Sequence, residues 1–278
     1  MKVSVLISLY KPNVKFLREL LESVVVSFNA CDQSLDYRIR CRFDGENEIN
    51  RELCLLLDTF NVEIDEIVSG RLGFAGSFLK IIQGCDHTSD LIFLSDQDDV
   101  WLPHKVSRTI NEYHRCSLPV DLLLSNSLIW TGSETLGHTV PPGYLRFYRE
   151  FSNKKIYAAI GPAQFFYGHN MVISGSFGGF VSDLLAENKF SIYSHDRFLF
   201  YLASLRDCGI VVDETPLVLY RQHKGQVIGG TFSGGLFARV RKKTVLLQET
   251  SFDLLTILKL LKSSYCVYLD LLVKNIYF

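Results

Sequence analysis

The sequence lacks paired cysteines, a strong net charge and a long apolar segment. Its seven cysteines are odd in number and scattered, with no CxxC spacing, so a disulfide framework and a zinc site are both disfavoured and a reducing cytoplasm is expected. Lys and Arg total 29 against 30 Asp and Glu, which excludes the basic field of a nucleic-acid-binding protein. No apolar run reaches the roughly 18 residues that a membrane-spanning helix needs.

The N-terminus is also unlike a targeting segment. "MKVSVLISLYKP" is a short apolar run without a small-residue cleavage site, so it is interpreted as a first strand and not as a signal peptide. Hydrophobic residues make up 47% of the 278 residues, which fits one large α/β domain, or one domain with an appendage.

Apolar strand patterns and helical patterns alternate four times in the first 115 residues. This alternation predicts a doubly wound, parallel sheet, in which ligands bind beyond the carboxyl ends of the strands. The expected strands are 3–9, 37–43, 62–68 and 91–94, and the expected helices are one from about residue 17 with Asn13 as N-cap, 48–60, 74–84 and 105–114.

The second half of the chain is less regular. Segment 131–165 is rich in Gly, Pro and Tyr and is expected to be a loop region over the site. A helix is predicted at 197–206, and short strands at 210–212 and 217–220. The predicted domain therefore spans 1–230, with one half at about 1–115 and the other at about 116–230.

A basic run, "ARVRKK", begins a tail at 231–278, and a heptad-like apolar stripe follows it. This pattern predicts an amphipathic helix that either docks on anionic lipid or packs against a partner helix, such as that of a second copy of the chain.

The stretch "LIFLSDQDDV" at 91–100 runs from a buried strand directly into three carboxylates, Asp96, Asp98 and Asp99. Like charges this close need a counter-charge, and Mg²⁺ or Mn²⁺ binds one or two such carboxylates together with substrate phosphates. A metal–diphosphate site is therefore the favoured interpretation. The alternative is a solvated acidic turn that caps the next helix.

Four further stretches contain candidate residues. Asp44 in "RFDGEN" could bind a ribose or base edge or belong to an Asp-Gly turn, and Gly73 lies in a glycine-containing segment that is not GxGxxG. Asp196 in "YSHDRFL" could be a catalytic base or a helix N-cap. In "YRQHKGQ", Arg221 could hold a diphosphate and His223 could bind a metal.

Taken in order, these motifs resemble family 2 glycosyltransferases, and most of all the bacterial rhamnosyltransferase-type enzymes. The resemblance covers roughly residues 3–228 and rests on "SVLISLYKP", "RFDGE", "LGFAGSF", "FLSDQDDVWLPHKV", "HDRFLFYLAS" and "PLVLYRQH". It implies a GT-A fold, which is a mixed and mainly parallel sheet flanked by helices, and metal-dependent transfer of a sugar from a nucleotide diphosphate. The half at about 1–115 would bind the nucleotide sugar, and the half at about 116–230 would bind the acceptor.

The resemblance also implies roles for individual residues. Asp96 and Asp98 would form the DXD pair with Asp99 beside them, Asp196 would be the general base, and His223 would contact the metal or the diphosphate. The nucleoside pocket would be lined by Ser8, Tyr10 and Asp44. Transfer would invert the anomeric configuration, so a dTDP-L-rhamnose donor would give an α-L-rhamnoside on a cell-surface polysaccharide such as O-antigen or capsule, or on a lipid-linked glycan.

The sequence departs from the family pattern at two places. Phe43 replaces the first of two acids that usually precede Gly45, and Gly168-His169-Asn170 replaces a Gly-Cys-Thr-like segment that lies near donor sugar and acceptor. The second departure bears on sugar specificity.

Three alternatives remain open. They are a UDP-hexose donor, a non-catalytic nucleotide-sugar-binding protein, and a haloacid-dehalogenase-like phosphatase, in which Asp96 would be a nucleophile but for which no GDxxxD motif is present. The expected location is the cytoplasm, free or at the inner face of the plasma membrane.

Overall fold

The structure of the chain is a computed structural model, and it describes residues 1–45, 49–65, 70–140, 167–187, 192–204, 206 and 208–223. Most of the expected loop region 131–165 and the whole expected helical tail 231–278 lie outside the described residues. Among the helices that are described, none is both long and apolar enough to cross a membrane.

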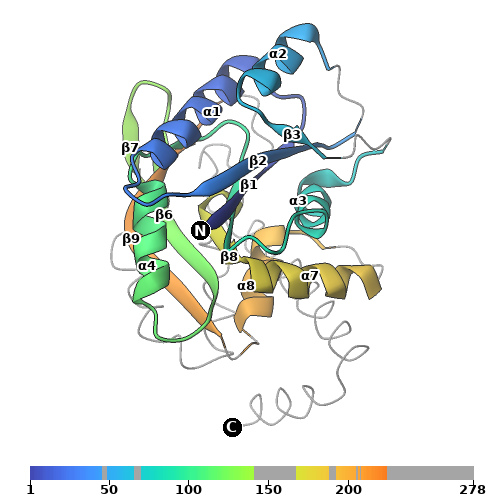
Figure 1. The fold of residues 1–278 in the computed structure, drawn as a ribbon. Helices are drawn as coiled ribbons and strands as arrows, with labels where there is room; N and C mark the ends of the chain where they lie inside the picture. The colour runs from blue at the N-terminus through green and yellow to red at the C-terminus, as the bar shows by residue number, and fades with distance from the viewer. Residues whose placement is uncertain are drawn as a thin grey trace, which may run out of the picture.

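The described strands form a single curled sheet in the order β3-β2-β1-β4-β8-β6-β9-β5, with β7 paired to β6 (Figure 1). The strands are β1 Lys2–Leu9, β2 Asp36–Phe43, β3 Glu63–Ile64, β4 Leu91–Ser95, β5 Val100–Trp101, β6 Val120–Trp130, β7 Thr135–His138, β8 Met171–Ser174 and β9 Gly209–Arg221. The helices are α1 Val14–Asn29, α2 Arg51–Thr59, α3 Gly73–Gln83, α4 Lys105–Arg115, α7 Gly175–Glu187 and α8 His195–Ser204, with the 3₁₀ turn η2 Gly168–Asn170.

Strands β1 to β4 are parallel to one another and are buried on both faces where they lie in the middle of the sheet. Along β4, Leu91 and Phe93 face one hydrophobic cluster while Ile92 and Leu94 face the other. A strand buried on both faces has a continuous apolar run instead of alternation. The four predicted strands and four predicted helices of this half are confirmed, with the third strand shortened to two described residues.

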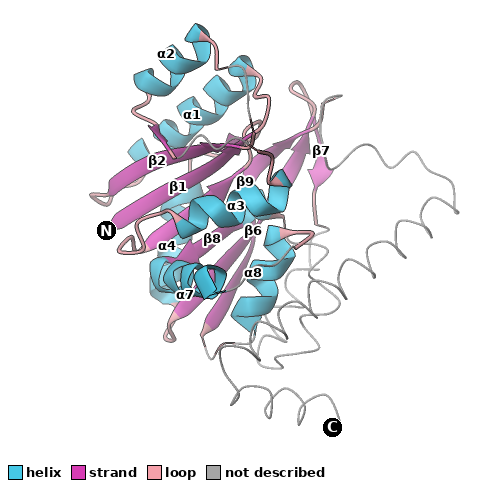
Figure 2. Cartoon of the chain, turned by 90° about the vertical axis from the view of Figure 1, so that its right-hand side faces the viewer, coloured by secondary structure: helices cyan, strands magenta, loops and turns pink. Residues whose placement is uncertain are grey.

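Helices cover the two faces of the sheet in separate layers. Helices α1, α2 and α4 pack on one face, and α3, α7 and α8 form the other layer, which faces the viewer in Figure 2. In the described part of the chain, each face of the sheet is therefore covered by an apolar core, which leaves the rim of the sheet for ligand binding.

The second half of the sheet differs from the predictions. β6, β8 and α7 were not expected, and β7 lies inside the segment expected to be a loop. Strand β9 is continuous where two short strands were predicted. Its register with β6 shifts across the polar middle, where Val212 pairs with Leu124 and Pro216 with Asn126. There Asp213 pairs with Arg108 of α4, at 2.8 Å from Nε to Oδ2, and also accepts from Thr215.

Strand direction determines which residues reach the rim. β8 runs antiparallel to both β4 and β6, whereas β6 and β9 are parallel. The ends of β1, β2, β4 and β9 therefore meet at the same rim as the start of β8. Residues that precede β8 therefore lie at the same rim of the sheet as residues that follow the parallel strands.

Candidate active site

The acidic loop 96–99 joins β4 to β5 and is tied to the end of β1. The backbone N–H of Tyr10 donates to Oε1 of Gln97 at 2.9 Å, and Nε2 of Gln97 donates to the Tyr10 carbonyl at 3.0 Å. These two hydrogen bonds hold the loop at Gln97, which lies between Asp96 and Asp98.

Arg221, at the end of β9, ties the other side of the loop. Its backbone N–H donates to Oδ1 of Asp99 at 3.0 Å, and its Nε donates to the Asp98 carbonyl at 2.6 Å. The guanidinium also pairs with Glu19 of α1 and lies between the rings of Phe16 and Trp130, 4.3 and 4.4 Å from their centroids. The expectation that Arg221 holds a diphosphate gains no support from these contacts, which make it a support of the acidic loop.

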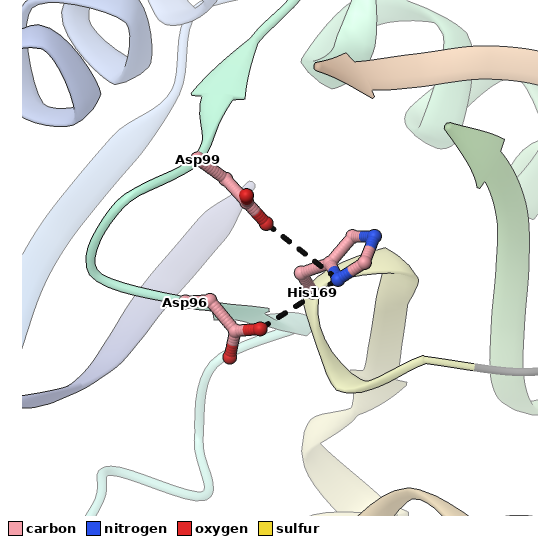
Figure 3. Close-up of side chains that lie close together, drawn as sticks. All are labelled: Asp96, Asp99 and His169. Atoms are coloured by element: carbon pink, nitrogen blue, oxygen red, sulfur yellow. Dashed lines mark ion pairs between the residues drawn. The ribbon is translucent and has the colours of Figure 1, made fainter. Parts of the chain in front are cut away.

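Asp96 and Asp99 converge on His169 of η2, as Figure 3 shows. Nδ1 of His169 lies 3.6 Å from Oδ2 of Asp96 and 3.5 Å from Oδ2 of Asp99. Asp99 and His169 are buried, and Asp96 is half-buried. One ligand atom from each of the three residues lies within 4.8 Å of the others.

This group fits a divalent cation. Cis ligands about 2.1 Å from an octahedral ion lie roughly 3 Å apart, slightly closer than the separations seen here. Oδ2 of Asp99 is buried and has no hydrogen-bond partner among the described residues, and a buried carboxylate oxygen normally has one. Carboxylate oxygens suit both Mg²⁺ and Mn²⁺, and an imidazole nitrogen among the ligands favours the softer Mn²⁺ over Mg²⁺.

Asp98 and His223 form a separate pair. Nε2 of His223 lies 2.6 Å from Oδ2 of Asp98, and the ring of His223 packs 5.2 Å from that of Phe16. The sequence predicted His223 as a ligand within one set with the three acids. The structure instead groups Asp96 and Asp99 with His169, and a metal contact by Asp98 or His223 stays a prediction.

The carboxylates of the loop disfavour one another's ionised forms. Burial, followed by the charge of Asp96, raises the pKa of Asp98, although the bond from His223 opposes the shift. Burial and the charges of Asp96 and Asp98 raise the pKa of Asp99 well above its ordinary value. A bound cation would remove this cost.

Lys105 at the start of α4 is, after Arg221, a second buried cation beside the acidic loop. Its Nζ donates to the His169 carbonyl at 3.0 Å and lies 4.5 Å from the Trp101 ring centroid. Burial lowers the pKa of Lys105 to about 7, while the charges of Asp99 and Asp96 oppose that shift. The ammonium therefore offsets part of the acidic charge and holds the backbone of η2.

Asp196 lies in the first turn of α8. Its Oδ1 accepts from the N–H of the next residue, Arg197, at 2.8 Å. An N-cap precedes the helix and accepts from the second or third helical N–H, so Asp196, as the second residue of α8, is not the N-cap that the alternative interpretation expected. Burial raises the pKa of Asp196 to about 7, and the charge of Asp96 adds to the shift. This coupling indicates that the predicted base and the acidic loop share one electrostatic environment.

The turn η2 touches α8 directly. A Cβ on Gly168 would lie 2.2 Å from Nε2 of His195, and the His195 ring stacks on Phe78 of α3 with centroids 4.2 Å apart. Burial lowers the pKa of His195 to about 4, so it is a neutral packing residue. It keeps η2 next to the helix that carries Asp196.

The expected nucleoside residues lie beside β1 and α3. Oδ1 of Asp44 accepts from the N–H of Leu72 at 2.7 Å, and its Oδ2 lies 3.8 Å from Nε of Arg71. The Arg71 guanidinium lies 4.0 Å from the ring centroid of Tyr10. Ser8 donates to Ser77 of α3 at 2.7 Å, and Gly73 begins α3 with φ of 75°.

Sequence reasoning missed several of these residues. Glu19, Arg71 and Lys105 are single charges on helices or loops, and no local pattern distinguishes them from surface charges. His169 had one signal, since Gly168-His169-Asn170 departs from the family pattern.

Two known proteins that are similar to this chain are named as sugar transferases. No protein-family model matches the chain. It is similar to the dTDP-rhamnosyl transferase RfbG of Shigella flexneri, with 27% identity over 172 residues, which cover 59% of this chain and 54% of that protein. TarS 1–349 of S. aureus, solved in complex with UDP-GlcNAc, matches with a TM-score of 0.55 and 14% identity over 81% of this chain and 60% of that one.

The mannosyltransferase PcManGT from Pyrobaculum calidifontis, solved in complex with GDP-Man and Mn²⁺, matches with a TM-score of 0.53 and 11% identity over 92% of this chain and 64% of that one. The chain thus spans between 54% and 64% of the length of these proteins. At such identities the structural likeness shows the fold. The described part of the chain has the GT-A fold of these glycosyltransferases, a mixed and mostly parallel sheet flanked by helices, as the sequence predicted.

Proposed function

We propose that this protein is an inverting, metal-assisted glycosyltransferase that moves a sugar from a nucleotide diphosphate to a hydroxyl of a growing polysaccharide or lipid-linked glycan. The observation that carries the proposal is the acidic loop of Asp96, Asp98 and Asp99 at the rim of a GT-A sheet, electrostatically coupled to Asp196. Such a rim is where α/β sheets bind ligands.

The metal would be held by Asp96 and Asp99 with His169. Asp98 of the same loop and its partner His223 would be further candidate ligands. When bound, a divalent cation stabilises the negative charge that develops on the departing diphosphate. This site is supported by the clustering of the three ligand atoms and by Oδ2 of Asp99, which has no hydrogen-bond partner within the described part of the chain.

Asp196 would act as the general base. Its carboxylate accepts the proton of the acceptor hydroxyl while that oxygen forms a bond to the anomeric carbon, and the bond from this carbon to the diphosphate oxygen breaks. The nucleoside diphosphate leaves with the electron pair, and one displacement inverts the anomeric centre. A base with a pKa of about 7 is about half ionised near neutral pH and basic enough to take a proton.

The proposed donor is dTDP-L-rhamnose. Its support is the similarity to RfbG, whereas TarS and PcManGT were solved with UDP-GlcNAc and GDP-Man, so a UDP-hexose is the competing donor. Tyr10 and Asp44, with Arg71 between them, would contact the nucleoside. The expected setting is the cytoplasm or the inner face of the plasma membrane, where such donors are available.

The experiment is a donor panel of dTDP-L-rhamnose, UDP-GlcNAc, UDP-glucose and GDP-mannose. We expect release of nucleoside diphosphate from one donor class, with dTDP-L-rhamnose first, and loss of that release when a chelator removes the metal. Addition of Mn²⁺ or Mg²⁺ should restore it.

Asp98→Asn serves as the matched variant, and Asp58→Asn on the exposed face of α2 is its control. The first should lose at least about tenfold in rate, as expected when a charge-stabilising group is removed, and the second should keep its rate. Tight binding of a nucleotide sugar without turnover, on any acceptor extract, would instead indicate a non-catalytic binding protein.

A further inference from the structure

The two ring nitrogens of His169 face different surroundings. Nδ1 faces Asp96 and Asp99, as described above, whereas Nε2 lies 3.0 Å from the hydroxyl of Ser127 on β6. A neutral histidine carries one proton, and the hydrogen bond at one nitrogen decides which nitrogen holds it. The positions of the protons in the hydrogen bonds around Ser127 therefore determine whether Nδ1 of His169 presents a proton or a lone pair to the acidic loop.

Asn126 is the fixed end of this network. Its Oδ1 accepts from the backbone N–H groups of Ser127 at 2.9 Å and Val140 at 3.2 Å, and its Nδ2 donates to the Val140 carbonyl at 3.0 Å. Backbone groups cannot exchange donor and acceptor roles, so they set the orientation of this amide.

The remaining protons follow from that orientation. The Thr139 hydroxyl faces two acceptors that cannot donate in return, Oδ1 of Asn126 at 3.1 Å and the Ser127 carbonyl at 3.4 Å. We assign its proton to them, and in the 2.8 Å contact with Ser127, where either hydroxyl could be the donor, Thr139 then accepts. The single proton of Ser127 then goes to Thr139. The lone pairs of the Ser127 oxygen are left to accept from Nδ2 of Asn170 at 3.1 Å and from the ring of His169.

We propose that this chain of hydrogen bonds from Asn126 through Thr139 and Ser127 holds His169 as its Nε2–H tautomer, so that the lone pair of Nδ1 is directed at the cation site of Asp96 and Asp99. Ser127 is then a positioning residue that acts through His169. The inference rests on the metal site of the proposed function but not on the sugar or acceptor.

The charges of Asp96 and Asp99 by themselves would attract a proton to Nδ1, so the support on the acidic side of the ring comes from the geometry. If Nδ1 carried the proton in a well-formed hydrogen bond, Oδ2 of Asp99 would have a donor, but among the described residues this buried oxygen has none. The separations of 3.5 and 3.6 Å exceed ordinary N–H···O distances. A ligand whose second nitrogen donates to a fixed acceptor is the common arrangement at metal sites.

The first test measures the tautomer in the metal-free protein. Nitrogen-detected NMR of ¹⁵N-histidine-labelled protein, with the signal assigned through His169→Gln, should show a protonated Nε2 and an unprotonated Nδ1. A protonated Nδ1, in either the other tautomer or the doubly protonated ring, would overturn the proposal.

The second test measures Mn²⁺ affinity by calorimetry with no sugar present. Ser127→Ala should weaken binding about 10- to 100-fold, the usual effect of losing a residue that orients a metal ligand, and Ser127→Thr should restore it because it keeps the hydroxyl. Ser125→Ala, on the same strand, is the matched control.

An Mn²⁺ affinity of Ser127→Ala equal to that of the wild type would contradict the positioning role. If Ser127→Ala fails to fold, the NMR measurement on the wild-type chain still decides the tautomer. Failure of every donor in the panel, with the tautomer and Mn²⁺ affinity as expected, would remove the proposed function and leave this inference standing.

Discussion

Asp196 combines a position in the first turn of α8 with a pKa raised to about 7 by burial. As the general base it must be ionised, so kcat/KM should rise with pH up to about 7 and then level off. Asp196→Asn should remove that rise and lower the rate about 10²- to 10⁴-fold. Transfer rates of both proteins between pH 5 and pH 9 test this expectation.

Stability supplies an independent check on the same residue. The folded pKa of Asp196 lies above its unfolded value, so between pH 4 and pH 7, roughly, the folded state binds more protons and the contribution of this group to stability falls as pH rises. The Asn variant should lack this part of the pH dependence in denaturant unfolding. An unchanged pH–rate profile in Asp196→Asn would mean that another group is the base.

At the residue scale, the sequence predicted what lies in local runs and missed what the fold brings together. Asp96, Asp98 and Asp99 follow a strand, so their place at the rim can be anticipated from spacing alone. His169 could not be anticipated in this way, because it precedes a strand. It reaches the rim only because β8 runs antiparallel to β4, and strand direction was not predictable from the local pattern.

At the element scale, the contact between η2 and α8 depends on the absence of a side chain at position 168. In Gly168→Ala the added Cβ would meet Nε2 and Cε1 of His195 at 2.2 and 2.7 Å, and the buried, stacked ring has little room to move. Overpacking of this kind costs about 1–3 kcal/mol. We expect urea unfolding to show that loss, together with weaker Mn²⁺ binding as η2 shifts.

Gly209→Ala provides the comparison for this prediction. A Cβ at that position would meet its nearest neighbours at 3.5 to 4.0 Å, which is ordinary van der Waals contact. The control should therefore keep its Mn²⁺ affinity and lose little stability. Equal effects of the two substitutions would show that the contact with His195 has no special role.

Strand β9 shows why other elements were mispredicted. Asp213, Glu214 and Thr215 interrupt its apolar pattern, which by periodicity alone indicates a loop between two short strands. The partner that keeps the segment extended, Arg108 of α4, lies over 100 residues away in sequence. Tertiary pairing overrode the local signal.

At the scale of the whole molecule, alternation of strands and helices was enough to predict a mainly parallel sheet with helices on both faces. The strand order was beyond this reasoning, because β8 inserts between β4 and β6 through a long connection. That insertion joins the two halves of the chain in one sheet. Ligands at the rim therefore contact elements from both halves and should stabilise the whole described domain.

This linkage gives a final prediction. A donor nucleotide sugar with Mn²⁺ at about 100 times its Kd should add about 2.7 kcal/mol of stability, which corresponds to a Tm increase of roughly 5–10 °C for a domain of this size. The pKa values of Asp98 and Asp99 are raised by burial and by neighbouring carboxylates, so protons compete with the cation as pH falls. The part of the increase that depends on Mn²⁺ should therefore shrink between pH 7 and pH 5 in thermal unfolding, and should be lost in Asp99→Asn but kept in Asp58→Asn. A metal-dependent increase that is the same at both pH values would place the cation away from these carboxylates.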